Sequence, residues 1–290
     1  MRLATVAWRG ATSAALVGDG WVAAVRQLPG REQAHDVYDL IGEPLSGSEV
    51  SELEGLGEPE EGACWLPPVL RPPKNVLCVG RNYVEHVNEG ARAEGRAAEM
   101  PGAPIWFTKP ATALVGCGSD VVLDRDFTSS LDYEGELAVV VGKACKKLSP
   151  RSALDAVFGY TIFNDVTARD VQHGSKQWFR GKSGDTYGPC GPWVTTADEV
   201  PDPQDLRIRT TVNGEARQSD STASMIFDVA TLIADVSAGL TLMPGDIIAT
   251  GTPSGVAWGM PQPVYLELGD EVAVEIEGLG RLWNRVAAGS

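Results

Sequence analysis

Two glutamates stand at the start of an apolar, β-branched run, in the stretch Asp132-Tyr133-Glu134-Gly135-Glu136-Leu137-Ala138-Val139-Val140-Val141. The run predicts a buried strand. Residues i and i+2 of a strand point to the same face, so the carboxylates of Glu134 and Glu136 are expected side by side. Two like charges beside a hydrophobic core are costly unless a positive charge lies between them. The pattern indicates a metal ion or, as the alternative, the solvated face of an edge strand.

The composition favours one large, β-rich core. The chain has 290 residues, 43% of them hydrophobic, and its 33 glycines and 19 prolines favour strands and loops over a helical bundle. The N-terminus shows no charged segment followed by an apolar one, and no apolar run reaches the roughly 18 residues that span a bilayer. We therefore expect a cytoplasmic protein without a membrane partner.

Charge and cysteine usage exclude further classes. The net charge of −15 argues against a nucleic-acid partner, because phosphate contacts need clustered lysines and arginines. An anionic substrate would need local positive charge at its site. The five cysteines contain no C-x-x-C pair and are odd in number, which predicts reduced thiols rather than disulfides or a zinc site.

The N-terminal quarter predicts a small separate domain. Residues 1–27 alternate apolar and polar positions between glycine turns, which predicts a three-stranded meander. A short helix is expected within 46–56, followed by an extended Pro-rich linker that ends near residue 73. We place the domain boundary near residue 70, giving domains 1–70 and 71–290.

The rest of the chain predicts strands with a few helices. Strands are expected at 75–80, 105–110, 159–164, 247–250, 264–268 and 272–276. Helices are expected at 149–157, where Ser149 and Pro150 form a start signal, and at 225–237. Residues 88–103 have no apolar period, which predicts a lid or a disordered segment.

Asp165 supplies a third carboxylate, because it ends the strand predicted at 159–164. Glu134, Glu136 and Asp165 are all hard oxygen donors, which select Mg²⁺, Mn²⁺ or Ca²⁺ over zinc or copper. Three such ligands leave about half of an octahedral shell for a chelating substrate and water.

His86 and Glu89 lie on one face if residues 84–90 form a helix. A carboxylate beside an imidazole raises its basicity, as a general base toward water requires. The alternative is a solvated surface pair. His35 is assigned to the surface, and His173, beside Gly174, to a loop.

Three common functional motifs are incomplete or absent in this sequence. Gly181-Lys182-Ser183 lacks the preceding glycine of a phosphate-binding loop, since Lys176 stands there. No G-x-G-x-x-G follows a predicted strand and no G-x-S-x-G is present, which argues against a dinucleotide cofactor and a serine hydrolase.

Together the motifs resemble the fumarylacetoacetate hydrolase family, nearest to its short acylpyruvase-like and 2-hydroxyhepta-2,4-diene-1,7-dioate isomerase-like members. The resemblance spans about residues 70–288 and rests on segments 79–83, 132–137, 159–172, 177–183, 212–215, 244–246, 250–256 and 278–280 with His86 and Glu89. It implies an α+β fold built as a β-rich mixed β-sandwich roll, here with a small N-terminal β-meander domain, and a homodimer.

The resemblance also implies a site. Mg²⁺ or Mn²⁺ would bind Glu134, Glu136 and Asp165. By position, His86 and Glu89 match a water-activating pair on a lid, and Lys182 matches a lysine beside the metal. Arg81, Gln172 and Thr252 match substrate-contacting positions. The chain departs from the family pattern at Gly184, usually Phe, and at Ala257-Trp258-Gly259-Met260, where Gly and a basic residue are common.

These residues predict a metal-dependent hydrolase that cleaves a C–C bond of an acylpyruvate-like 1,3-dicarbonyl acid. The alternative is a decarboxylase or keto–enol isomerase of a 2-oxo acid or diacid such as oxaloacetate or a hydroxymuconate. A catalytically idle binding protein is a third reading. It would be expected to have lost Glu134, Glu136, Asp165, Lys182 or His86, and none is lost.

Overall fold

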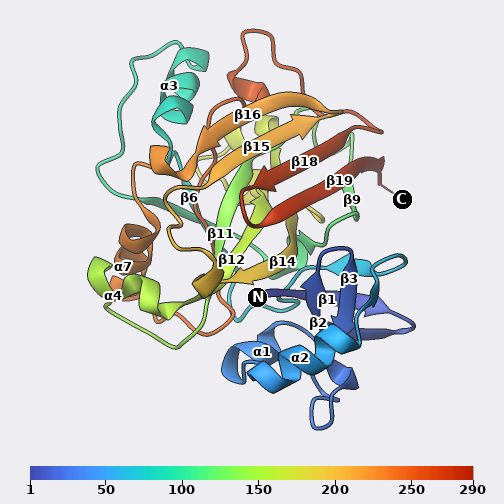
Figure 1. The fold of residues 1–290 in the computed structure, drawn as a ribbon. Coiled ribbons are helices and arrows are strands. Elements are labelled where there is room, and N and C mark those ends of the chain that lie inside the picture. The colour runs from blue at the N-terminus through green and yellow to red at the C-terminus, as the bar shows by residue number, and fades with distance from the viewer. Residues whose placement is uncertain (290) are drawn as a thin grey trace.

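A large mixed β-sheet runs through the molecule in the computed structural model, which describes residues 1–289 (Figure 1). In spatial order its strands are β4 (Glu58–Pro59), β3 (Trp21–Ala24), β2 (Ala11–Gly18), β1 (Arg2–Trp8), β14 (Gly188–Thr196), β12 (Val157–Asn164), β11 (Gly135–Val141), β17 (Ile247–Ala249), β6 (Val76–Gly80) and β7 (Ile105–Lys109). Two short strands join beside this path: β5 (Cys64–Leu66) pairs with β1, and β8 (Leu114–Val115) pairs with β14.

A second sheet packs on one face of the first. Its strands, in order, are β16 (Glu215–Ser221), β15 (Arg207–Val212), β18 (Glu271–Ile276), β19 (Gly280–Ala288) and β9 (Asp120–Leu123). A two-stranded ladder joins β10 (Leu131–Asp132) to β13 (Thr167–Ala168). The helices are α1 (Tyr38–Gly42), α2 (Gly47–Gly55), α3 (Val84–Ala93), α4 (Pro150–Ala153), α5 (Arg169–His173), α6 (Phe179–Lys182) and α7 (Val229–Gly239).

Strand β11 is buried on both faces and divides the core. Leu137, Val139 and Val141 pack in the cluster shared with the second sheet. Ala138 and Val140 face the opposite cluster, which reaches α1 and α2. The alternation places the two glutamates at the start of this strand on the second of these faces. The expected buried strand and the β-rich α+β fold are confirmed.

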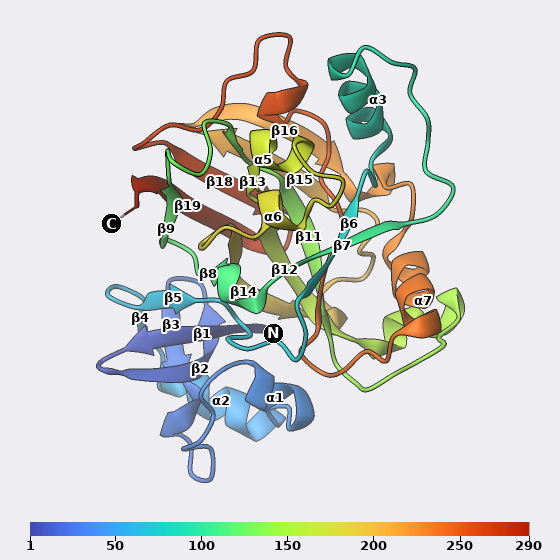
Figure 2. The ribbon, with the colours of Figure 1, turned by 180° about the vertical axis from the view of Figure 1, so that it is seen from behind.

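The predicted N-terminal meander is confirmed as β1, β2 and β3, and the predicted helix as α2. Ser46 and Glu49 form a reciprocal capping box at the start of α2. The meander continues the large sheet, because Leu3 on β1 pairs with Val194 on β14. In both views this region lies at the opposite end of the molecule from α3 (Figure 2). A domain boundary near residue 70 stays a prediction.

Most predicted strands of the C-terminal part are confirmed as β6, β7, β12, β17 and β18. The segment 88–103 differs from its prediction, because its first six residues complete α3 and only the residues after Ala93 form a loop. All five cysteines are unpaired. Within residues 1–289, no helix is long and apolar enough to cross a bilayer.

Two helix boundaries and one strand were also predicted wrongly. The helix expected at 225–237 begins at Val229, because Asp228 caps it by accepting a hydrogen bond from the Thr231 N–H (2.7 Å). Residues 264–268 form no strand, although they alternate. The helix expected at 149–157 ends at Ala153 and continues as a 3₁₀ turn, and the Ser149 side chain caps no backbone N–H.

Asn82 fastens the start of α3 to two distant segments. Its side-chain N–H groups donate to the carbonyls of Phe227 (3.0 Å) and Thr250 (2.7 Å), and its oxygen accepts from the Phe227 N–H (2.8 Å). Asn82 is fully buried. Its neighbour Arg81 has φ 58°, a left-handed conformation that is uncommon outside glycine. The Asn82 bonds therefore fix the chain where it leaves β6 and enters α3.

Asn82→Ala should lower the free energy of unfolding by about 3 kcal/mol, because buried backbone groups of Phe227 and Thr250 lose their partners. Urea unfolding followed by circular dichroism measures the change. Asn75→Ala is the matched control: Asn75 is exposed and makes one long bond to Thr108 (3.3 Å), so its loss should cost no more than about 0.5 kcal/mol. Equal losses in the two variants would contradict this assignment.

Candidate functional site

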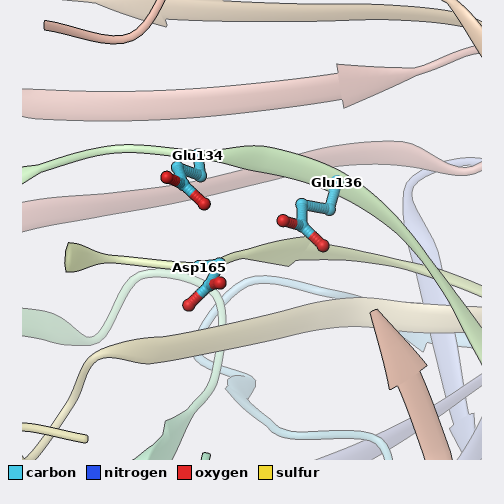
Figure 3. Close-up of side chains that lie close together, drawn as sticks. All are labelled: Glu134, Glu136 and Asp165. Atoms are coloured by element: carbon cyan, nitrogen blue, oxygen red, sulfur yellow. The ribbon is translucent and has the colours of Figure 1, made fainter. Parts of the chain in front are cut away.

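Three buried carboxylates converge at one end of the large sheet. Glu134 and Glu136 lie just before and within β11, and Asp165 follows β12. Their ligand atoms lie within 4.8 Å of one another. Figure 3 shows the carboxylates of Glu134 and Glu136 on one side of their segment, with Asp165 on the neighbouring one. The exposed fractions are 5% for Glu134, 1% for Glu136 and 0% for Asp165, so the solvated-edge alternative is wrong.

Two hydrogen bonds donated by backbone N–H groups hold the segments together at this point. The Asp165 N–H donates to the Glu134 carbonyl (2.8 Å), and the Glu134 N–H donates to the Asn164 side-chain oxygen (3.0 Å). The antiparallel pairing of β11 with β12 sets this register, with Gly135 opposite Asn164. The three carboxylates are thus positioned by the ladder itself rather than by a mobile loop.

Three buried cations neutralise part of this charge. Lys182 Nζ, on α6, donates to Glu134 Oε2 (2.6 Å) and Asp165 Oδ2 (2.8 Å). Lys109 Nζ, at the end of β7, donates to Asp165 Oδ1 (2.5 Å) and to the Val166 carbonyl (3.0 Å). Arg169 Nη2 lies 2.7 Å from Glu134 Oε1, in an ion pair without hydrogen-bond geometry.

Arg169 also binds a fourth buried carboxylate, Asp132. Arg169 Nε donates to Asp132 Oδ2 (2.8 Å), and Asp132 accepts bonds from the N–H groups of Ala257 (2.9 Å) and Trp258 (3.1 Å). Four carboxylates therefore face three cations in this cluster. With all groups ionised, one negative charge is left over.

Glu136 carries that uncompensated charge. Among the described residues, its recorded hydrogen bond is the one accepted from the Gly251 N–H (2.8 Å), and no cation forms an ion pair with it. Burial and then the negative charges of Asp165 and Glu134 raise the pKa of Glu136 well above its ordinary value. A divalent cation would remove this penalty, and an all-carboxylate donor set suits Mg²⁺ or Mn²⁺. The residues present fit such an ion.

Glu134 is perturbed in the opposite direction. Burial alone would raise its pKa, but the cations of Lys182 and Arg169 outweigh burial and lower the pKa of Glu134 to about 2. The same balance keeps Lys182 charged: burial lowers its pKa, whereas Asp165 and Glu134 raise it further, so the net shift is upward. Burial lowers the pKa of Lys109, against an opposing effect of Asp165.

A cavity of about 470 Å³ opens onto the carboxylates. All the residues assigned to catalysis or substrate contact from the sequence line it except Glu89; they are Arg81, His86, Gln172, Lys182 and Thr252. Of the metal-binding candidates, Glu134 and Glu136 line the cavity, whereas Asp165 does not and is bonded to Lys182, which does. Residues from five separate segments therefore meet in one space.

His86 and Glu89 lie together on α3, as the helical spacing predicts. His86 Nδ1 is 3.4 Å from Glu89 Oε2. The buried Glu89 carboxylate also accepts bonds from the Gly255 N–H (2.9 and 3.2 Å), which ties α3 to the turn at Ala257–Gly259. A Cβ on Gly259 would lie 2.2 Å from the Glu89 carboxylate, so only glycine allows this approach. The solvated-pair alternative for His86 and Glu89 is wrong.

Several residues of the site were missed from the sequence. Lys109 gave no signal except its place at the end of an apolar strand. His173 was assigned to a loop, but it ends α5 and lines the cavity, with its ring 4.7 Å from that of Trp258. Trp178 also lines the cavity. Aromatic residues within motif segments were the only available hint of these walls.

Residues 75–287, well over half of the chain, match the family described as "Fumarylacetoacetate (FAA) hydrolase C-terminal". The chain belongs to the fumarylacetoacetate hydrolase family. Enzymes of this family cover hydrolase and isomerase or tautomerase activities on small organic acids.

Individual members of the fumarylacetoacetate hydrolase family are similar over nearly the whole chain. Oxaloacetate tautomerase YisK of Bacillus subtilis is 44% identical over 269 residues, which cover 93% of this chain and 83% of the relative. The solved fumarylacetoacetate hydrolase of Exiguobacterium antarcticum has a TM-score of 0.86 at 39% identity, covering 100% of both chains. Maleylpyruvate hydrolase of Sphingobium sp. SYK-6, solved with manganese(II) and pyruvate, has a TM-score of 0.79 at 31% identity, also covering 100% of both.

The opposite pKa shifts predict opposite effects of two matched substitutions in metal-free protein at pH 7. Glu134→Gln should lower the free energy of unfolding by roughly 1 to 3 kcal/mol, because it removes an anion held by Lys182 and Arg169. Glu136→Gln should raise it, because it removes an anion without a cation partner. Urea unfolding in the presence of a chelator measures both.

The pH dependence gives an independent check. The folded-state pKa of Glu136 is raised, so its contribution is present at low pH and is lost as pH rises through that pKa. The pKa of Glu134 is lowered, so its contribution is present above about pH 4.5 and is lost as pH falls toward about 2. Glu136→Gln should therefore make the metal-free protein less sensitive to rising pH. Loss of stability in both variants at pH 7 would contradict the charge balance.

Proposed function

We propose that this protein is a divalent-metal-dependent hydrolase that cleaves a C–C bond of an acylpyruvate-like 1,3-dicarbonyl acid. The observation that carries this proposal is His86, with Glu89 at its Nδ1, facing the same cavity as Glu134 and Glu136. A base for water and a set of metal ligands thus share one space. The cavity volume of about 470 Å³ also leaves room for an acyl group beyond the 2-oxo acid.

Glu134, Glu136 and Asp165 would hold Mg²⁺ or Mn²⁺. When bound, the ion would act as a Lewis acid toward the two oxygens of a chelating 2-oxo acid. The manganese and pyruvate found together in the maleylpyruvate hydrolase structure support a site of this kind. In this chain, the excess negative charge of the carboxylate cluster also supports a bound cation.

The protein's own groups would carry the proton transfers. With Nδ1 facing Glu89, His86 accepts a proton from water through Nε2, and the resulting hydroxide attacks the acyl carbonyl. The C–C bond then breaks, and its electron pair passes to the 2-oxo acid as an enolate. Lys182 stabilises that negative charge from its buried position, where an ammonium acts more strongly than in water. Protonation of the enolate gives the second acid product.

Substrate binding would rest on Arg81, Gln172 and Thr252. Their side chains line the cavity beside Lys182 and Arg169. Arg81 would add to the local positive charge that a chain of net charge −15 needs for an anion, and Gln172 and Thr252 would supply polar groups for hydrogen bonds. The homodimer and the cytoplasmic location expected from the sequence stay predictions.

The second candidate is keto–enol tautomerisation or decarboxylation of a 2-oxo diacid such as oxaloacetate. The 44% identity to an oxaloacetate tautomerase, over 93% of this chain, supports it. The reaction would use the same enolate and the same base without attack by water. A panel of acylpyruvates, oxaloacetate and hydroxymuconate-type diacids, assayed with Mg²⁺ and with Mn²⁺, separates the two candidates. Turnover of the diacids alone would favour the second.

His86→Ala should lower kcat for acetylpyruvate hydrolysis by about 100-fold or more, because water loses its general base. Release of pyruvate, measured by a coupled assay, reports the rate. His35→Ala is the control, since His35 is exposed and far from the cavity, and it should retain wild-type kcat. Unchanged hydrolysis in the His86 variant would refute water activation by this residue.

Glu136→Gln should weaken Mn²⁺ binding on the order of 100-fold or more, because it removes a ligand of the ion. Calorimetric titration measures the affinity. Wild-type affinity should also fall as pH is lowered, because a proton competes with the ion for Glu136, whose pKa is raised. Asp185→Asn, which changes an exposed carboxylate, is the control. Full activity in an excess of chelator would refute the metal site.

A further inference from the structure

The cavity changes character from its buried end to its mouth. At the buried end, Glu134, Glu136 and Lys182 are at most 5% exposed. Toward solvent the lining includes two partly buried indoles, Trp178 and Trp258, and the exposed ring of His173. The charged end suits the 2-oxo acid head of a substrate. The aromatic end would face whatever group extends from that head.

Trp258 is fixed at this mouth by a backbone hydrogen bond and by contacts of its ring. Its backbone N–H donates to Asp132 Oδ2 (3.1 Å), and the Asp132 carboxylate also accepts a bond from Arg169. The His173 ring packs on the indole with centroids 4.7 Å apart and an interplanar angle of 55°. On the side of α3, a Cβ on Gly90 would lie 3.3 Å from the indole. The indole is therefore confined between α3 and α5.

A cation also lies over each of the two indoles that line the cavity. Arg81 Cζ is 5.9 Å from the centroid of Trp178, whose ring also makes an edge contact with Phe107 at 5.5 Å. Arg169 Cζ is likewise 5.9 Å from the centroid of Trp258. Both indoles are thus oriented by neighbours rather than left to rotate. Fixed aromatic surfaces favour flat, unsaturated groups, which stack at van der Waals distance, over puckered saturated ones.

We infer that Trp258, backed by His173, selects substrates whose acyl group is flat and unsaturated, such as an aroyl or dienoyl group. The inference rests on the proposed function, because it assigns the acyl end of a substrate whose 2-oxo acid end binds the carboxylate site. Trp258 is a specificity residue in this assignment, and His173 is a positioning residue that acts through it.

The test compares two ring acids that differ in flatness and not in carbon number. Phenylpyruvate and 3-cyclohexylpyruvate both carry the 2-oxo acid head, and neither has the second carbonyl that hydrolysis needs. Calorimetry on the Mn²⁺-loaded wild-type protein should give a Kd about 5-fold lower for phenylpyruvate. Trp258→Leu should bring the two Kd values within about twofold, whereas Trp258→Phe, which keeps a flat ring, should retain most of the preference.

His173→Leu provides a second variant, should Trp258→Leu fail to fold, and it should also reduce the ratio of the two Kd values. Trp8→Leu is the matched control, because Trp8 lies on β1 and does not line the cavity. It should keep the wild-type ratio. Equal Kd values in the wild-type protein, an unchanged ratio in a folded Trp258→Leu protein, or no binding of either acid would overturn the inference.

Binding of these acids does not depend on hydrolysis, so the two proposals fail separately. A phenylpyruvate preference that Trp258→Leu abolishes, in a protein that cleaves no acylpyruvate, would refute the proposed hydrolase and leave the specificity role standing. Acylpyruvate cleavage with no preference between the ring acids would support the proposed hydrolase and refute the specificity role of Trp258.

Discussion

The charge balance around Glu136 is the constraint on which the rest of the site depends. Lys182 and Arg169 pair with the Glu134 carboxylate and keep it an anion. Two positions further on, the one hydrogen bond recorded for the Glu136 carboxylate within residues 1–289 comes from the Gly251 N–H. A fully neutralised cluster would be a stable core ion-pair network with little attraction for a further cation. One uncompensated carboxylate turns the same cluster into a site that gains stability when a cation binds.

That arrangement requires side chains from segments that are far apart in the sequence to be placed accurately relative to one another. The β11–β12 ladder places the carboxylates, and Lys109 reaches them from β7 across the sheet. Asn82 fixes where the chain turns from β6 into α3, and Glu89 fastens α3 to the turn that carries Trp258. The rigid sheet therefore sets the acid–metal end of the site, and a few hydrogen bonds to loops set the base and the mouth.

Sequence reasoning succeeded where the signal is local. The spacing of Glu134 and Glu136, the short helix within 46–56 and the i, i+3 pair on α3 each follow from the geometry of one element. Sequence reasoning failed where the structure or role of a residue depends on a partner that is distant in the sequence. Residues 264–268 alternate like a strand, but they are not assigned as one, although the Leu266 N–H donates to the Leu131 carbonyl of β10 (2.8 Å). Lys109 becomes a site residue only because Asp165 lies opposite it. His173 needed Trp258, 85 positions further on, to become part of a wall.

The pairing of β1 with β14 has a consequence for how the chain reaches its native state. Leu3 pairs with Val194, and the Met1 amino group donates to Thr196 Oγ1, so this end of β1 cannot pair until β14, about 190 residues further along the chain, has been synthesised. Contacts this distant in sequence slow folding, because a long loop must close before they form. β5 covers Thr5, Val6 and Ala7 on the same edge of β1, so only the Arg2–Leu3 end stays unpaired until β14 is made. A short unpaired edge of this kind offers little surface for misassembly during synthesis.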